Sequence, residues 1–212
     1  MVNDDIARVR ALVGALDEPI VVLDSERRVV ASNVGLPPGR RVGDVDDALV
    51  LFLGELETGR EVVSLGRTVA LPILEEVAHA YADRATNAEV KLVVTGGAEI
   101  ELPLRPRMIR VVVENLVQNA IRYAGPESTC RVSVEQEGQI AVLAVADNGS
   151  GVRESELPRL FERFYRADQA RTSRGTGLGL AIVKHVATSA GGTIEASSPP
   201  GRGLEIVCRF PL

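Results

Sequence analysis

Hydrophobic periodicity is clearest in the part of the chain that follows residue 67. Apolar positions between Leu71 and Ala85 recur every three to four residues, which predicts one face of a helix. The same spacing predicts a helix over 106–124 and another over 178–190, after a glycine-rich stretch. Apolar runs between and after these helices predict strands at 90–94, 100–102, 132–135, 140–146, 193–196 and 204–210. Helices interspersed with antiparallel hairpins predict an α+β fold, in which the helices pack on one face of a mixed sheet.

The N-terminal part carries a different pattern. A helical spacing of apolar residues runs from Ile6 to Leu16, and two short apolar runs flank the polar turn 24–26, which predicts a hairpin. A helix is expected at 48–56 and a short strand at 61–65. We therefore divide the chain into a small N-terminal α/β appendage, residues 1–66, and a main domain, residues 67–212.

Two resemblances compete for the appendage. The run P-I-V-V-L-D-S-E-R-R-V-V-A-S-N resembles part of a PAS-type sensory domain. The stretch 46–59, with L-G-E-L-E-T-G-R, is instead similar to the remnant of a helix from a phosphoacceptor dimerisation domain. The sequence does not decide between them.

Composition narrows the function classes. A formal net charge of −5 and an aromatic content of 3% disfavour a binder of single-stranded nucleic acid, which needs positive charge and aromatic stacking platforms. The apolar stretches fall well short of the ~20 residues that cross a bilayer, and the N-terminus lacks the positive start of a signal peptide. Cys130 and Cys208 do not form a CxxC metal pair, so reduced thiols are expected. We expect a cytoplasmic protein, or the soluble part of a longer membrane receptor.

Three polar residues share one face of the helix expected over 106–124. Asn115, Asn119 and Arg122 are spaced i, i+4 and i+7, whereas apolar neighbours such as Leu116 point elsewhere. An Asn carbonyl oxygen is a hard ligand suited to Mg²⁺, and a guanidinium suits phosphate. Taken alone, this pattern is also that of an ordinary solvated helix face.

The string D-N-G-S-G, residues 147–151, stands where an apolar strand ends. The ionised Asp147 only accepts hydrogen bonds, so it can pair with the exocyclic amine of adenine and disfavour guanine, which carries a carbonyl there. Gly149 and Gly151 allow a close approach of backbone or a positive φ. The alternative is an ordinary Asx turn.

A glycine-rich loop and an aromatic cluster complete the set. Gly175, Gly177 and Gly179 lead into a helix whose N-terminal amides can cradle phosphates, although no Walker A lysine follows. The string L-F-E-R-F-Y-R, residues 160–166, concentrates aromatic side chains and predicts a hydrophobic anchor. The polar stretch 166–174, which carries several arginines, is then expected to form a mobile lid over phosphates, with a plain surface loop as the alternative.

In order and spacing, the four motifs resemble the ATP-binding fold shared by histidine kinases, gyrase, Hsp90 and MutL, known as the Bergerat fold. The aromatic string is similar to that of the histidine-kinase branch, and the resemblance covers residues 68–212. It implies a two-layer α/β sandwich that binds ATP and Mg²⁺ and acts as an ATP-dependent protein histidine kinase.

The resemblance also implies roles for single residues. Asn119 would hold Mg²⁺, and Asp147 would read adenine. The phosphates would be met by Asn115, Arg122 and Arg166 and bordered by Gly175, Gly177 and Gly179, and the base would be lined by Tyr123, Gly149 and Gly151. The expected ATP-binding set is completed by Phe161, Phe164, Thr176 and Leu178.

A phosphoacceptor histidine is the part of the pattern that this sequence does not show. The two histidines are His79 and His185, and neither is followed by residues like the H-E-x-x-T-P of an acceptor helix. The resemblance therefore implies two partners besides ATP. They are a histidine-bearing dimerisation domain and a response regulator, in trans or in a longer parent protein.

Two other functions stay open. A serine kinase of the anti-sigma-factor type shares the fold, but that branch has a Glu general base where this chain has Asn115, and Glu114 points ~100° around the helix. An imidazole is nucleophilic at neutral pH and needs no such base, which favours the histidine-kinase branch. The second alternative is a nucleotide-sensing module without catalysis.

Overall fold

The computed structural model describes residues 21–23, 29–32, 65–166 and 177–212. The chain divides into two compact units, Met1–Val62 and Val63–Leu212. In the first unit, β1 (Val21–Leu23) pairs antiparallel with β2 (Val29–Ser32), which confirms that the two apolar runs form paired strands. The helices expected at 6–16 and 48–56 lie outside the described residues, as does most of the strand expected at 61–65.

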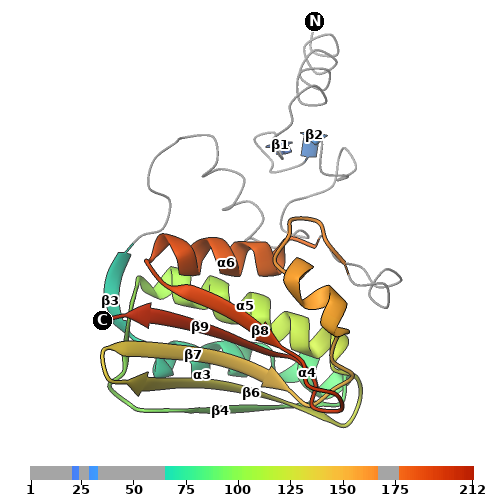
Figure 1. Cartoon of the computed structure of the whole chain (residues 1–212), viewed down its shortest axis with the longest axis horizontal. Helices are drawn as coiled ribbons and strands as arrows, with labels where there is room; N and C mark the ends of the chain where they lie inside the picture. Colours follow the sequence, from blue (N-terminus) through green and yellow to red (C-terminus); the bar gives the residue numbers. More distant parts are fainter. Residues whose placement is uncertain (1–20, 24–28, 33–64, 167–176) are drawn as a thin grey trace, which may run out of the picture. The chain divides into compact units, whose positions relative to one another are not determined.

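A five-stranded mixed sheet forms one layer of the second unit (Figure 1). Its strand order is β4-β6-β7-β9-β8, in which β4 and β6 run parallel and every other neighbouring pair runs antiparallel. The bounds are Val90–Gly96 for β4, Ser128–Glu137 for β6, Ile140–Asp147 for β7, Thr193–Ser197 for β8 and Glu205–Pro211 for β9. The sequence pattern predicted all five of these strands and the mixed character of the sheet, and both are confirmed.

A separate two-stranded sheet joins β3 (Leu65–Val69) antiparallel to β5 (Glu101–Leu104). The sequence of β3, L-G-R-T-V, lacks an uninterrupted apolar alternation, so its strand conformation depends on the ladder with β5. β3 also spans the division between residues 66 and 67 that the sequence pattern indicated.

Three helices cover one face of the large sheet: α3 (Leu71–Ala80), α5 (Pro106–Tyr123) and α6 (Gly179–Ser189) (Figure 1). α5 contacts β6 and β7 and lies between α3 and α6. A proline at the start of α5 suits the first helical turn, where its fixed φ is helical and no N–H is needed. A short helix, α4 (Ala82–Asn87), follows α3 after Tyr81, whose φ of −100° and ψ of 0° leave the helical region. The helical face expected over 71–85 is therefore divided between two helices.

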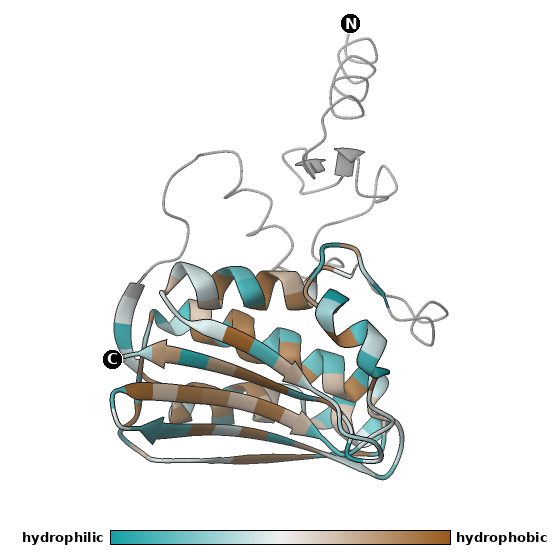
Figure 2. Ribbon diagram, in the orientation of Figure 1, coloured by the Kyte–Doolittle hydropathy of each residue, from teal (hydrophilic) through white to brown (hydrophobic). Residues whose placement is uncertain are grey.

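The hydrophobic core lies between the sheet and the helices. Figure 2 shows apolar residues recurring along the strands and helices. On the sheet side, Val132, Val134 and Leu143 are completely buried, and on the helix side Val113 is completely buried and Leu116 is 2% exposed. This two-layer packing confirms the sandwich that the sequence predicted. It also fixes the C-terminal end of β7 beside the C-terminal end of α5, where the main-chain N–H of Ser150 donates to the carbonyl oxygen of Ala124.

Candidate functional site

Asn115 lies at the contact between α5 and α6. Its side chain is only 8% exposed, and its Nδ2 donates a hydrogen bond to the carbonyl oxygen of Val111 at 2.8 Å. Its Oδ1 faces the first residue of α6, because a Cβ added to Gly179 would come within 2.7 Å of that oxygen. A glycine is therefore needed at 179 for α6 to begin this close to α5, and the two motifs that carry Asn115 and Gly179 meet in space.

Asn119 and Arg122 follow Asn115 along the same helix. Asn119 is half-buried, and its side chain makes no hydrogen bond to any residue that the structure describes. Arg122 is exposed, with its guanidinium carbon 6.0 Å from the ring centroid of the half-buried Tyr123. Within the described part of the chain, the side-chain amide of Asn119 is therefore available to a ligand at the edge of the core. The guanidinium of Arg122 follows about one turn further along α5.

Asp147 ends β7, and its two carboxylate oxygens differ in their hydrogen bonds to the described residues. Oδ1 accepts hydrogen bonds from the main-chain N–H groups of Gly149, at 2.9 Å, and Leu204, at 3.3 Å. Oδ2 has no hydrogen-bond partner among the described residues. Burial raises the pKa of the carboxyl group above its ordinary value, and the two N–H groups oppose that rise by stabilising the charged form. The free oxygen is an acceptor in a partly desolvated position, where a hydrogen bond is stronger than in water.

The loop after Asp147 is fastened to its surroundings by close main-chain contacts. A Cβ on Gly149 would lie 2.1 Å from the carbonyl oxygen of Ala124, so only glycine allows the loop to pack on the end of α5. The side-chain oxygen of Asn148 accepts a hydrogen bond of 2.6 Å from the main-chain N–H of Thr129 at the start of β6. The D-N-G-S-G motif and the polar face of α5 are thus adjacent, as a shared ligand site requires.

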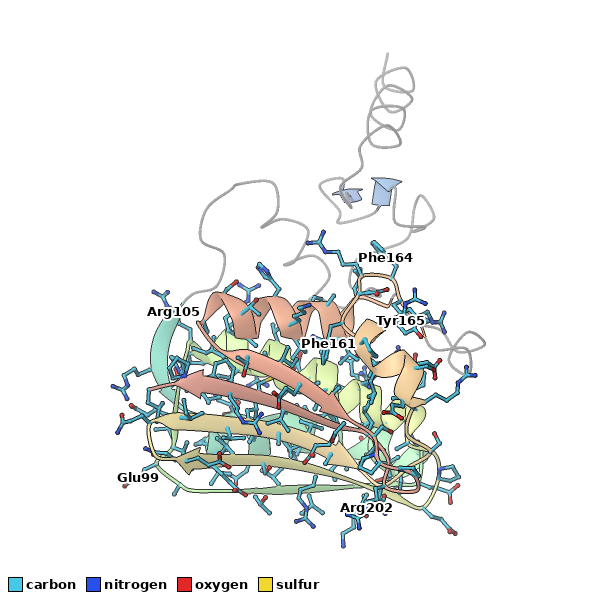
Figure 3. The ribbon with its side chains drawn as sticks, viewed as in Figure 1. Glu99, Arg105, Phe161, Phe164, Tyr165 and Arg202 are labelled. Carbon is cyan, nitrogen blue, oxygen red and sulfur yellow. The ribbon has the colours of Figure 1, made fainter. Side chains whose placement is uncertain are left out.

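The glycine-rich loop and the aromatic cluster also meet. The main-chain N–H of Phe164 donates to the carbonyl oxygen of Gly177 at 3.0 Å, and both residues have a positive φ, 62° and 71°. Figure 3 shows Phe161, Phe164 and Tyr165 together in the segment that follows η2 (Glu154–Arg159). Phe164 is 43% exposed, so it is less firmly anchored in the core than the sequence pattern indicated.

The remaining expected site residues divide into three groups. Leu178 is 1% exposed, so its side chain belongs to the core and only its main chain can face a ligand. Arg166 is half-buried at the end of the described segment. Gly175, Thr176 and the expected lid residues 167–174 lie outside the described residues.

Comparison with known proteins decides the family. Residues 104–212 match the family model described as histidine kinase-, DNA gyrase B- and HSP90-like ATPase. The chain belongs to this ATPase family. The match begins at the end of β5 and includes α5, β7, α6 and β9, the elements that carry or border the polar residues described above. The main domain is therefore an ATP-binding domain of this family.

Proteins similar to this chain include sensor proteins and sensor histidine kinases. The sensor-like histidine kinase SenX3 of Mycolicibacterium smegmatis is 30% identical over 95% of this chain, which spans 51% of that protein. The phosphate regulon sensor protein PhoR of Pseudomonas aeruginosa is 46% identical over 54% of this chain and 25% of its own length. The solved structure of the mycobacterial sensor histidine kinase MprB superposes with a TM-score of 0.63 at 25% identity, covering 69% of this chain and 97% of that one. The chain thus spans about half or less of the curated relatives, and it contains the catalytic ATPase domain of the histidine-kinase type.

The two histidines of the main domain lie on helices α3 and α6. His79 is exposed on α3. His185 is half-buried on α6, where burial and the positive charge of Arg163 lower the pKa of its imidazole. The two thiols are buried, and burial raises the pKa of both Cys130 and Cys208 to about 12, so both are uncharged at neutral pH.

Sequence reasoning missed the main-chain groups that hold the site of the ATPase domain. The N–H of Leu204 holds Asp147 although the two residues are far apart in the sequence. An apolar side chain gives no sign that its own N–H binds a carboxylate. Ser198, whose hydroxyl accepts a hydrogen bond from the main-chain N–H of Val152, was missed for a different reason, because a pair of serines before two prolines looks like part of an ordinary turn.

Proposed function

We propose that this chain is the catalytic part of a two-component sensor histidine kinase, which binds Mg-ATP and presents its γ-phosphate to a histidine on another domain or chain. The observation that carries the proposal is the free Oδ2 of Asp147, held in place by two hydrogen bonds to the other oxygen of the same carboxylate. Two of the similar proteins, SenX3 and MprB, are named as histidine kinases, which supports the same reaction.

Adenine recognition is assigned to Asp147. A carboxylate with one oxygen free can accept the exocyclic amine of adenine, and guanine offers a carbonyl at that position, which a carboxylate repels. Tyr123 lies beside this loop, since the hydroxyl of Ser150 donates to its carbonyl oxygen at 3.3 Å. The base would therefore lie near the ends of β7 and α5.

Mg²⁺ and the phosphates are assigned to the polar residues of α5 and to the start of α6. Asn119 fits a hard cation, because its half-buried amide has no side-chain hydrogen bond within the described part of the chain. Arg122 supplies positive charge, and α6 begins at Gly179 with no side-chain cap among the described residues, at a helix N-terminus whose dipole favours an anion. Bound Mg²⁺ would neutralise phosphate charge, and the residues named here would orient the nucleotide.

The nucleophile is expected from a separate domain. Phosphoryl transfer depends mainly on positioning and charge stabilisation, so the accepting imidazole can arrive on another chain. Asn115 supports a histidine acceptor over a serine, because its amide is no general base and is occupied by Val111. A response regulator would take the phosphoryl group next. One structural neighbour, the histidine kinase ThkA, is described as a complex with a response regulator protein, TrrA.

The setting of the reaction follows from its substrate. ATP is made and used inside the cell, so we place the reaction in the cytoplasm. No helix in the described part of the chain is long and apolar enough to cross a bilayer. The N-terminal unit is proposed to be a PAS-like sensory segment or a remnant of a dimerisation domain, attached to the catalytic domain.

Radiolabelled phosphate transfer tests the proposal. The chain is incubated with γ-labelled ATP and Mg²⁺, with and without a separate histidine-bearing dimerisation domain from a related kinase. We expect acid-labile, base-stable label on the partner domain alone. The label should be absent when the partner histidine is replaced, and strongly reduced in the Asn119→Ala variant of this chain.

Each result has a separate meaning. Label on His79 or His185 would show that this chain carries its own acceptor. ATP binding without transfer to any dimerisation domain offered would favour a nucleotide-sensing module instead. Absence of ATP binding would contradict both functions.

A further inference from the structure

Ser198 connects the loop that follows the D-N-G-S-G motif to the turn between β8 and β9. Its hydroxyl accepts a hydrogen bond of 2.9 Å from the main-chain N–H of Val152 and donates one of 2.7 Å to the carbonyl oxygen of Gly203. A hydroxyl has one hydrogen to donate, and this one is fully used. In Figure 3, Arg202 marks the turn that Ser198 holds.

The carbonyl that Ser198 binds belongs to the same peptide unit as the N–H that binds Asp147. That unit joins Gly203 to Leu204, and its N–H donates to Oδ1 of Asp147 at 3.3 Å. A peptide unit is planar, and in the trans form its C=O and N–H point in opposite directions. A hydrogen bond from Ser198 at one side of the plane therefore fixes the direction of the N–H at the other side. It also polarises the unit, which strengthens the N–H as a donor.

Two glycines make this arrangement possible. Gly203 has a φ of +74°, and a Cβ there would lie 2.1 Å from the carbonyl oxygen of Asp147. Gly151 has a φ of +66°, and its Cβ would lie 2.5 Å from Oγ of Ser198. The three segments that carry Asp147, Gly151 and Gly203 are thus in close contact around the Ser198 hydroxyl, in a geometry that no other residue type at 151 or 203 allows without strain.

We infer that Ser198 is a positioning residue for adenine recognition. Its hydroxyl orients the Gly203–Leu204 peptide, and the N–H of that peptide holds Oδ1 of Asp147, which leaves Oδ2 available to the base. The inference rests on the proposed role of Asp147 and adds the residue that controls it. Ser198 itself touches no nucleotide in this scheme. Its effect should therefore appear only through Asp147.

Calorimetric titration of the full chain with ATP and with GTP tests the inference, using the variants Ser198→Ala, Ser198→Thr and Ser197→Ala. Ser198→Ala should weaken ATP binding roughly threefold to tenfold, the usual effect of losing such a hydrogen bond, and should leave the weaker GTP binding nearly unchanged. Ser198→Thr keeps the hydroxyl and should restore most of the ATP affinity. Ser197 is the matched control, because it is exposed and its hydroxyl binds only the side chain of Glu205 among the described residues.

The pH dependence of ATP binding provides a readout that a purely structural defect would not move. Binding needs the charged form of Asp147, so affinity falls as the pH drops through the pKa of that carboxyl group. The Leu204 N–H stabilises the charge, and loosening it in Ser198→Ala should move the acid midpoint of ATP binding to higher pH. An equal loss of ATP and GTP affinity with an unmoved midpoint would overturn the inference.

A double variant separates this inference from the proposed function. In an Asp147→Asn background, Ser198→Ala should have little further effect on ATP affinity. If Asp147→Asn alone leaves ATP affinity unchanged, the proposed function fails at its central residue. If Asp147→Asn weakens binding but Ser198→Ala behaves like wild type, the proposed function stands and the positioning role is wrong.

Discussion

At the scale of single residues, Asp147 combines a cost in stability with the role in recognition that we propose for it. The folded chain buries part of its carboxylate, which raises its pKa, and two main-chain N–H groups offset only some of the lost hydration. A polar group held in this way is stabilised best when a ligand completes its hydrogen bonds. The chain without nucleotide therefore tolerates an incompletely paired charge at the position that we propose to read the base.

Replacing Asp147 by Asn should weaken ATP binding. The variant places an NH₂ group near the adenine amine or turns its one acceptor away, so a charged hydrogen bond is lost. Such bonds contribute about 1.5–3 kcal/mol, which corresponds to a loss of affinity of roughly tenfold to 150-fold. Calorimetry with ATP measures it, and Asp83→Asn, on the exposed surface of α4, is the control that should bind like wild type. Equal ATP affinity in all three proteins would remove Asp147 from the site.

The same substitution should raise the stability of the nucleotide-free protein at neutral pH. An acid whose pKa is higher in the folded than in the unfolded chain favours folding when protonated, so its charged form costs stability above the folded pKa. Asp147→Asn removes that cost. The gain in unfolding temperature over wild type should be present at pH 7, should shrink as the pH falls through the raised pKa of the folded chain, and should be gone below about 4, the ordinary pKa of an Asp.

Thermal unfolding with saturating ATP provides the complementary measurement. ATP stabilises whichever protein binds it more tightly, so the order of wild type and Asp147→Asn should reverse when nucleotide is added. A variant that is less stable than wild type at pH 7 without ATP would contradict the charge argument. It would mean that the hydrogen bonds to the charged Oδ1 stabilise the folded chain more than burial of the charge destabilises it.

The sequence alone points to Asp147, Asn119 and the glycines as site residues because of their chemical types, and these assignments stay predictions. It did not predict which oxygen of Asp147 is free, because that depends on the N–H of Leu204. Leu204 is far from Asp147 in the sequence and directly precedes β9. It also treated Leu178 as part of the ATP site by resemblance, whereas the side chain is buried in the core. Main-chain donors and the direction of side chains follow from tertiary packing, which a residue string does not show.

At the scale of elements, the site depends on how closely α5 approaches the loop after β7. The helical spacing of apolar residues predicted α5, and the run of apolar residues predicted β7. The bounds of both agree with the expected ranges to within one residue. The break at Tyr81 and the strand β3 were not predicted, because a helical apolar spacing continues across the break and β3 forms through its ladder with β5. Local pattern is thus sufficient where an element buries one continuous face, and insufficient where a partner decides the conformation.

Gly149→Ala should separate the loop from α5. The added Cβ would meet the carbonyl oxygen of Ala124 at 2.1 Å, and a main-chain atom cannot move aside as a flexible side chain can. Overpacking of this kind costs about 1–3 kcal/mol, and the loop that carries Asp147 should shift with it, so both unfolding free energy and ATP affinity should fall. Urea unfolding and calorimetry measure the two effects.

Gly138→Ala is the matched control for this change. Gly138 turns between β6 and β7 with a φ of +63° and has open space around the missing Cβ. Its substitution strains the backbone by about 1 kcal/mol but lies at the opposite end of β7, so ATP affinity should be unchanged. A Gly149→Ala variant with normal ATP affinity would show that the site does not depend on this contact.

At the scale of the whole molecule, every described residue of the site belongs to the unit Val63–Leu212. This unit contains both layers of the sandwich, and two of its largest fully buried side chains, Leu74 and Phe210, come from its first helix and its last strand. The two ends of the unit are therefore joined through one core. Its start at Val63 also keeps β3 together with its partner β5.

A fragment of residues 63–212 should accordingly fold and bind ATP by itself, in one cooperative unfolding transition and with an affinity within about twofold of the full chain. A second fragment, 71–212, lacks β3 and Ala70, which are paired with β5 and the residue before it, so it should unfold at a lower temperature. Circular dichroism and calorimetry on both fragments measure this. If 63–212 failed to fold while the full chain bound ATP, the N-terminal residues would have to supply part of the core, and the division into two units would not describe how this protein is built.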